Sequence, residues 1–154
     1  MAPPKIPSPE ICEIIRNKKS RYCRYADTGM LESHFHEIAL PDATFEFRGD
    51  NSDQPIEHAG VKFSWPSRDG FVGFFGAGLR VQDCIHVVGP GELEQVGPDE
   101  VKAVFSVMYS AVPKGDASKK PSCVGGGYYH ETWKRVGDDW FMASLSMQST
   151  IFGL

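Results

Sequence analysis

The sequence has no long hydrophobic run and no excess of basic charge. Its apolar stretches fall well short of the roughly 18 residues that cross a bilayer, so no membrane partner is expected. The proline-rich start, Met1–Pro9, lacks the apolar run of a secretory signal, which favours a cytoplasmic protein. With 16 basic against 20 acidic residues and a net charge of −4, no basic stripe forms, and nucleic acid is not an expected partner.

Metal and nucleotide motifs are also missing. The four cysteines have neither CxxC spacing nor a histidine pattern for zinc, and they are expected as reduced thiols: Cys12, Cys23, Cys84 and Cys123. The glycine run Gly125–Gly127 is not followed by a predicted helix, so it favours a bend in a strand over a phosphate-binding loop. No metal and no cofactor are therefore expected.

What the sequence does contain is the composition of one globular domain. It has 154 residues, of which 41% are hydrophobic and 23% are charged. A chain of this length and composition can enclose a core. We predict a flexible arm over residues 1–8 and a single domain that binds a small molecule over residues 9–154.

The order of the predicted elements is helices first and strands afterwards. Caps, stop residues and helical spacing predict three helices. The first covers 9–26, from Ser8-Pro9 to a stop at Asp27-Thr28-Gly29, and the second covers 30–38 and is ended by Leu40-Pro41-Asp42. The third begins at Pro66-Ser67-Arg68-Asp69. Alternation and tight turns predict strands over 43–48, 81–89, 92–97, 101–112, 122–136 and 140–151, with 49–55 as a polar loop. Consecutive strands joined by tight turns favour an antiparallel meander, and the whole order indicates an α+β fold.

Four stretches carry a resemblance to a known family. They are Arg21-Tyr22-Cys23-Arg24-Tyr25-Ala26-Asp27, Pro66-Ser67-Arg68-Asp69-Gly70-Phe71-Val72, Ile85-His86-Val87-Val88 and Gly127-Tyr128-Tyr129-His130-Glu131-Thr132-Trp133. Their order and spacing over residues 10–150 resemble the nuclear transport factor 2-like superfamily, in its SnoaL-like and scytalone dehydratase-like branch. The resemblance implies a cone-shaped, curved, mixed or antiparallel sheet with three N-terminal helices covering its concave face, as in a cystatin-like roll.

The same resemblance implies an acid–base pair inside the cone, formed here by Asp27 and His86. This chain departs from scytalone dehydratase at several positions. Ala26, Phe47 and Ala111 stand where that enzyme has two tyrosines and its second active-site histidine. The sequence therefore matches the scaffold and half of the catalytic machinery.

The residues themselves add further catalytic candidates. Alternation places His86 on one face of its strand, and a histidine beside a carboxylate suits general acid–base work. Tyr129 and Glu131 share one face of a later strand. A buried phenol needs a partner and can polarise a carbonyl, whereas a buried carboxylate either lines the pocket or pairs with an arginine. The predicted catalytic residues are Asp27, His86, Tyr129 and Glu131.

The apolar faces of the predicted elements converge on one pocket. Its expected substrate-binding wall is Tyr22, Phe47, Phe71, Phe75, Val107 and Tyr109, together with Tyr129, and its expected floor is Asp27 and His86. On an ideal helix Asp27 points about 160° away from the apolar stripe. We therefore expect the helix to end before Asp27, so that its carboxylate can reach the pocket.

These features favour a cofactor-independent acid–base enzyme. The predicted reaction is that of an isomerase, cyclase or dehydratase on a hydrophobic polyketide- or terpenoid-like intermediate of secondary metabolism. One alternative is a non-catalytic ligand-binding or dimerisation domain. Another is an epoxide hydrolase, in which Glu131 would join Asp27 in activating water. A homodimer is expected through the outer face of the sheet, predicted to carry Tyr128, Thr132, Val136, Leu145 and Met147.

Overall fold

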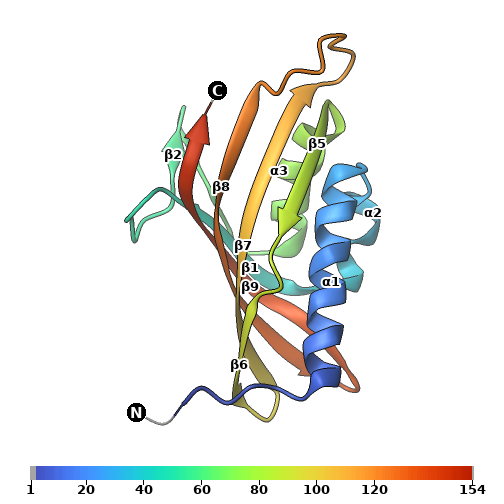
Figure 1. Ribbon diagram of the computed structural model, residues 1–154, viewed down its shortest axis with the longest axis vertical. Helices are drawn as coiled ribbons and strands as arrows, with labels where there is room; N and C mark the ends of the chain where they lie inside the picture. Colours follow the sequence, from blue (N-terminus) through green and yellow to red (C-terminus); the bar gives the residue numbers. More distant parts are fainter. Residues whose placement is uncertain (1–2, 154) are drawn as a thin grey trace.

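The computed structural model describes residues 3–153 of the chain. Within them the helices are α1 (Pro9–Asp27), α2 (Leu31–His34), the 3-10 helix η1 (Phe35–Glu37) and α3 (Arg68–Arg80). The strands are β1 (Ala39–Arg48), β2 (Glu57–His58), β3 (Val61–Lys62), β4 (Ser64–Trp65), β5 (Gln82–Val88), β6 (Glu92–Gly97), β7 (Glu100–Pro113), β8 (Cys123–Val136) and β9 (Asp139–Gly153) (Figure 1). In this part of the chain no helix is long and apolar enough to span a membrane.

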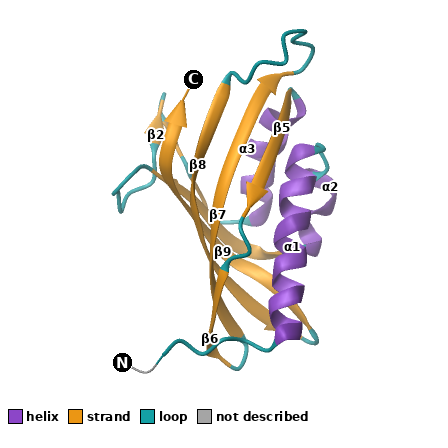
Figure 2. Cartoon of the chain, viewed as in Figure 1, coloured by secondary structure: helices purple, strands orange, loops and turns teal. Residues whose placement is uncertain are grey.

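One strongly curved sheet forms the body of the fold. Its strand order is β4-β1-β9-β8-β7-β5, with β6 also paired to β7, while β2 and β3 form a separate two-stranded ribbon. The helices lie on one side of this sheet (Figure 2). Because α3 contacts both β1 and β5 near opposite edges of the sheet, it spans the open side of a cone. The predicted α+β fold is confirmed.

The meander prediction holds only for part of the sheet. Strands β7, β8 and β9 pair antiparallel in chain order, but β1 runs parallel to β9. The sheet is therefore mixed. Alternation along a strand reports which side chains share a face and carries no information about the direction of the neighbouring strand.

The first helix begins and ends almost where the sequence predicts. The Ser8 hydroxyl accepts a hydrogen bond from the Ile11 amide at 3.4 Å, and Pro9 occupies the first turn. The helix runs one residue beyond the prediction, to Asp27, and Gly29 follows in the left-handed region at φ +70°. Glycine adopts this conformation without the steric cost of a Cβ, which explains the stop.

The second helix is shorter than predicted, and the strand after it is longer. Helix α2 and η1 end by Glu37, and β1 starts at Ala39, so Leu40-Pro41-Asp42 lies within the strand instead of terminating a helix. The pairing of β1 with β9 shifts register between Ala39 and Thr44, and Pro41 is exposed there. A proline is tolerated at such an irregularity because no ladder hydrogen bond is required of its nitrogen.

The N-terminal arm is attached at two points. The Lys5 carbonyl accepts a hydrogen bond from the Gln95 amide of β6 at 2.7 Å. Pro7 is buried, and its carbonyl accepts a weak hydrogen bond from Cys12 Sγ at 3.7 Å. Residues 1–2 of the predicted arm and Leu154 at the other end of the predicted domain lie outside the described residues.

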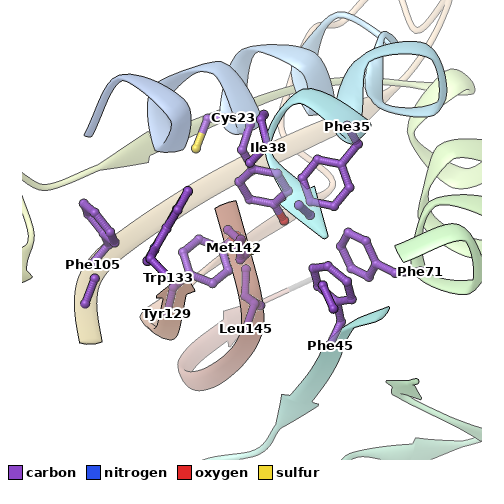
Figure 3. Close-up of a cluster of buried hydrophobic side chains, with 14 of the residues drawn as sticks. Cys23, Phe35, Ile38, Phe45, Phe71, Phe105, Tyr129, Trp133, Met142 and Leu145 are labelled. Carbon is purple, nitrogen blue, oxygen red and sulfur yellow. The ribbon is translucent and has the colours of Figure 1, made fainter. Parts of the chain in front are cut away.

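The core lies between the helices and the inner face of the sheet (Figure 3). Its largest buried side chains come from every layer, including Phe35, Phe45, Phe71, Phe105 and Trp133. Leu145 and Met147 also belong to it, with 1% and 2% exposure. The prediction that these two lie on the outer face is wrong, because they pair directly with Glu131 and Tyr129 and so share the inner face.

The outer face of the sheet carries a different apolar surface. Val87 pairs with Met108, and Met108 and Ile151 are both neighbours of Gly126, so their side chains share one face. We call the following set the outer patch: Ile85, Val87, Met108, Tyr128 and Ile151, each exposed by 49–62%. Of the residues predicted for this face, Tyr128 and Val136 are exposed, whereas Thr132 is 9% exposed.

A buried ion pair joins α1 to the sheet. Lys19 Nζ lies 2.5 Å from Glu131 Oε1, and both side chains are fully buried. The other carboxylate oxygen of Glu131 accepts a hydrogen bond from Trp133 Nε1 at 2.8 Å. The Lys19 ammonium also lies over the Tyr129 ring, 3.6 Å from its centroid. The expected cation partner of Glu131 was an arginine, and it is a lysine from the first helix.

We predict that Glu131→Gln lowers the free energy of unfolding by about 3 to 5 kcal/mol, because it leaves the Lys19 charge buried without a counter-ion. Denaturant unfolding followed by circular dichroism measures the change. The matched control is Asp99→Asn, which removes a surface ion pair with Arg135 and should cost less than about 1 kcal/mol. Equal losses in the two variants would contradict a structural role for the buried pair.

Candidate active site

A large cavity occupies the open half of the cone. Its volume is about 880 Å³, and α1, α3, β1, β5, β7, β8 and β9 all contribute to its lining. Among the lining residues are six of the predicted wall positions together with His86: Tyr22, Phe47, Phe71, Phe75, Tyr109 and Tyr129. The volume lies within the range of pockets that enclose one small organic molecule.

One side of the cavity is a continuous aromatic wall. Phe47 from β1 and Phe71 and Phe75 from α3 pack with ring centroids 5.0 to 6.3 Å apart. Phe63 and Phe74 extend the wall. Phe74 follows the helical spacing of Phe71 and Phe75, but Phe63 comes from a segment of two-residue strands that the sequence did not predict. Such a surface favours a flat, apolar ligand.

Asp27 and His86 meet at the edge of the cavity. His86 Nδ1 lies 2.6 Å from Asp27 Oδ1, and Asp27 Oδ2 accepts a hydrogen bond from the His86 amide at 3.0 Å. The two bonds hold the carboxylate and the imidazole in one orientation. Because Nδ1 faces the carboxylate, Nε2 is the nitrogen left for a ligand.

The position of Asp27 differs from the prediction in two ways. The helix includes Asp27 as its last residue, yet the carboxylate still reaches β5. This is possible because α1 packs against both β5 and β9, so two sides of the helix meet the curved sheet. Asp27 also lies behind His86 instead of on the cavity floor, and His86 alone of the two lines the cavity.

Glu131 and Val107 do not line the cavity. Glu131 is held by Lys19 and Trp133, and Val107 is 2% exposed within the core. Both residues point to the inner face, as alternation predicts. They lie deeper in the packed part of the cone, however, and alternation reports the side of a strand without reporting depth.

Two tyrosines lie together at the inner end of the cavity. The rings of Tyr22 and Tyr129 meet edge to face, with centroids 6.0 Å apart, and both are buried. Burial raises the pKa of the Tyr22 hydroxyl and that of the Tyr129 hydroxyl well above the ordinary range. Both phenols are therefore neutral at physiological pH and can only donate or accept hydrogen bonds.

Cys84 is a third group at the Asp27–His86 pair. Its thiol donates a weak hydrogen bond to Asp27 Oδ1 at 3.5 Å. Burial and the negative charge of Asp27 raise the pKa of Cys84 to about 12, so the thiol stays protonated and is a poor nucleophile.

The three side chains also qualify by type as metal ligands. Ligand atoms of Asp27, Cys84 and His86 lie within 4.8 Å of one another. However, Nδ1 and Oδ1 are only 2.6 Å apart, whereas two ligands of a tetrahedral zinc ion are separated by about 3.3 Å. The observed geometry fits a shared proton better than a shared cation.

Comparison with known proteins assigns the family. The SnoaL-like domain profile matches residues 10–146. The chain belongs to the SnoaL-like family. It is 44% identical over 142 residues to "Probable cyclase FGR4" of Gibberella zeae, and the aligned residues cover 92% of each chain.

Solved structures agree on the fold at much lower identity. A scytalone dehydratase-like protein of Novosphingobium aromaticivorans matches with a TM-score of 0.73 and 14% identity, over 92% of this chain and 85% of that one. A nuclear transport factor 2-like superfamily protein of Salmonella enterica matches with a TM-score of 0.72 and 11% identity, over 94% of each chain. The predicted SnoaL-like membership is confirmed, and the solved structures agree with the predicted nuclear transport factor 2-like fold.

We predict that Cys84 reacts slowly with iodoacetamide. A rise in the thiol pKa from 9.0 to about 12 lowers the thiolate fraction near neutral pH about a thousandfold. Mass spectrometry of the Cys123→Ser protein follows the labelling of Cys84, whose rate should rise as pH increases past 9. Asp27→Asn should accelerate labelling, because it removes a negative charge beside the thiol. Labelling of Cys84 at the rate of free glutathione would contradict the assignment.

Proposed function

We propose that this SnoaL-like protein is a cofactor-independent acid–base enzyme, an isomerase, cyclase or dehydratase. Its substrate would be a hydrophobic, polyketide- or terpenoid-like intermediate. The observation that carries the proposal is the 2.6 Å contact between His86 and Asp27 at the edge of an apolar cavity. The 44% identity to a probable cyclase supports the same class of enzyme and favours cyclisation among the three reactions.

The proposed chemistry is proton transfer through His86. Nε2 takes a proton from a substrate carbon or hydroxyl and later returns it at another position. Asp27 keeps Nδ1 protonated and stabilises the imidazolium that forms, the role that a buried carboxylate plays beside a catalytic histidine. The apolar walls exclude water, which strengthens the electrostatic interaction of this pair.

The other predicted catalytic residues take different roles in the proposal. Tyr129 is a neutral phenol that can donate a hydrogen bond to a substrate at the inner end of the cavity. Glu131 neutralises Lys19 and holds α1 in place. This pairing also disfavours the epoxide hydrolase alternative, which requires a second free carboxylate beside Asp27.

We predict that His86→Ala and Asp27→Ala each reduce proton-transfer catalysis at least about 10²-fold. The assay is elimination from 5-nitrobenzisoxazole, a flat apolar compound whose ring opens when a base removes its carbon-bound proton. The double variant should be little worse than either single one, because the two residues act as a unit. His36→Ala, at an exposed histidine, serves as the control.

A wild-type rate no faster than that of the His86→Ala protein would contradict this function. That result would favour the alternative of a cavity that only binds its ligand. Circular dichroism of each variant separates loss of chemistry from loss of fold.

We also propose that the protein is a homodimer joined through the outer patch. Five large, half-exposed apolar side chains on one face are unusual for a surface that faces only water. Light scattering at micromolar concentration should return twice the chain mass of 17.1 kDa. Val87→Lys with Met108→Lys should return the monomer, whereas Val96→Lys, at an exposed position of β6, should not. A wild-type monomer would end this proposal.

A further inference from the structure

Tyr109 places a phenol directly beside the Asp27–His86 pair. His86 of β5 and Tyr109 of β7 are opposite residues in neighbouring strands, so they share the inner face of the sheet. Their ring centroids are 5.7 Å apart with a 32° tilt, and both line the cavity. A ligand that contacts His86 therefore also comes within reach of Tyr109.

The hydroxyl of Tyr109 is free to bind a ligand. Among the residues that the structure describes, it has no hydrogen-bond partner, whereas the Tyr25 hydroxyl donates to Glu37 at 2.8 Å. Burial raises the pKa of Tyr109, so the hydroxyl keeps its proton and can donate it in a hydrogen bond. In an apolar cavity, a hydrogen bond from a neutral donor becomes stronger when its acceptor becomes negatively charged.

Gly125 is the residue on which the Tyr109 ring rests. It lies opposite Tyr109 in β8, and a Cβ built at this glycine would lie 2.3 Å from both Cζ and Oη of the tyrosine. No real Cβ approaches another atom so closely, so any larger residue would push the ring away. The absence of a side chain at 125 thus determines where the hydroxyl lies.

The neighbouring glycines have another role. A Cβ at Gly126 would meet the Val107 carbonyl at 2.8 Å, and one at Gly127 would meet the Gln148 carbonyl at 1.9 Å. Both contacts involve backbone, and the β8–β9 pairing shifts register between these two glycines. The predicted strand irregularity explains Gly126 and Gly127, but only the Tyr109 ring explains Gly125.

We propose that Tyr109 Oη donates a hydrogen bond to the substrate oxygen that gains negative charge during proton transfer, and that Gly125 is the positioning residue for this donor. The substrate class that fits is an enolisable carbonyl compound with an apolar body on the aromatic wall. This inference rests on the function proposed above for His86 and extends it with a second group.

The step balances without a further reactant. His86 Nε2 takes the proton from the carbon next to the carbonyl. The C–H electron pair forms the C=C bond of an enolate, and the C=O pair moves onto the oxygen that Tyr109 holds. The enolate carbon then either attacks another carbonyl of the same substrate molecule or is reprotonated. In both cases the His86 imidazolium returns its proton to the substrate.

The test uses 4-nitrophenolate as a mimic of the enolate and nitrobenzene as the same ring without the oxygen. Tyr109→Phe should weaken 4-nitrophenolate binding about 10- to 100-fold, the range of one hydrogen bond to a charged group, and leave nitrobenzene binding unchanged. Isothermal titration measures the affinity. The absorbance maximum of bound 4-nitrophenolate, which responds to hydrogen-bond donation, gives a readout that a purely structural role would not move.

Gly125→Ala should also weaken 4-nitrophenolate binding and change the absorbance maximum of the bound ligand, although Tyr109 is still present. In a Tyr109→Ala background it should add nothing, because the ring that it displaces is gone. The matched control is Gly73→Ala, where a Cβ would meet nothing within 4 Å.

Three outcomes would overturn the inference. These are no binding of 4-nitrophenolate to the wild type, unchanged binding to Tyr109→Phe, or equal loss of both ligands in that variant. Failure here is separable from failure of the proposed function, because binding of 4-nitrophenolate requires no proton transfer by His86, whereas the His86→Ala and Asp27→Ala elimination rates are compared with Tyr109 intact.

Discussion

The ion pair between Lys19 and Glu131 is the constraint on which the site depends. It joins the middle of α1 to β8 deep in the core, where a shift of either partner would leave a buried charge unpaired. Asp27 lies eight residues further along the same helix, about 12 Å away at 1.5 Å per residue. A helix anchored at Lys19 therefore carries the Asp27 carboxylate to a defined place on β5.

Two walls of the cavity offer a ligand different kinds of contact. Phenylalanines of β1 and α3 form the apolar side and can bind only by shape and stacking. On the inner face of the sheet the polar groups are His86 of β5, Tyr109 of β7 and Tyr129 of β8, and further polar residues, among them Glu57 and His58 of β2, also line the cavity. Because the sheet curves around the helices, these groups surround the same space although they lie on different strands. In such an apolar space each polar contact has a large effect on orientation and charge.

Proteins whose sequences have little in common with this chain share its fold. Structures at 11% and 14% identity keep the same arrangement of helices and sheet. The chemistry of each member must therefore reside in a few side chains of the cavity. In this chain Phe47 and Ala111 give the cavity apolar lining, and His86, with Asp27 behind it, is a base held in one orientation by two hydrogen bonds.

Much of this molecule follows from local sequence. Ser8-Pro9 and Gly29 define α1, turn residues define β7 to β9, and the resemblance to known proteins pointed to Asp27 and His86. Spacing along one strand tells which side chains share a face, but it does not tell how deep a residue lies or which distant residue it meets. For this reason the pairing of Glu131 with Lys19, the burial of Leu145, and the place of Tyr109 over Gly125 were decided only by the tertiary structure. The ion pair joins residues 112 positions apart, which meet only when the sheet curls around α1, and Tyr109 lies over Gly125 because of the register between β7 and β8.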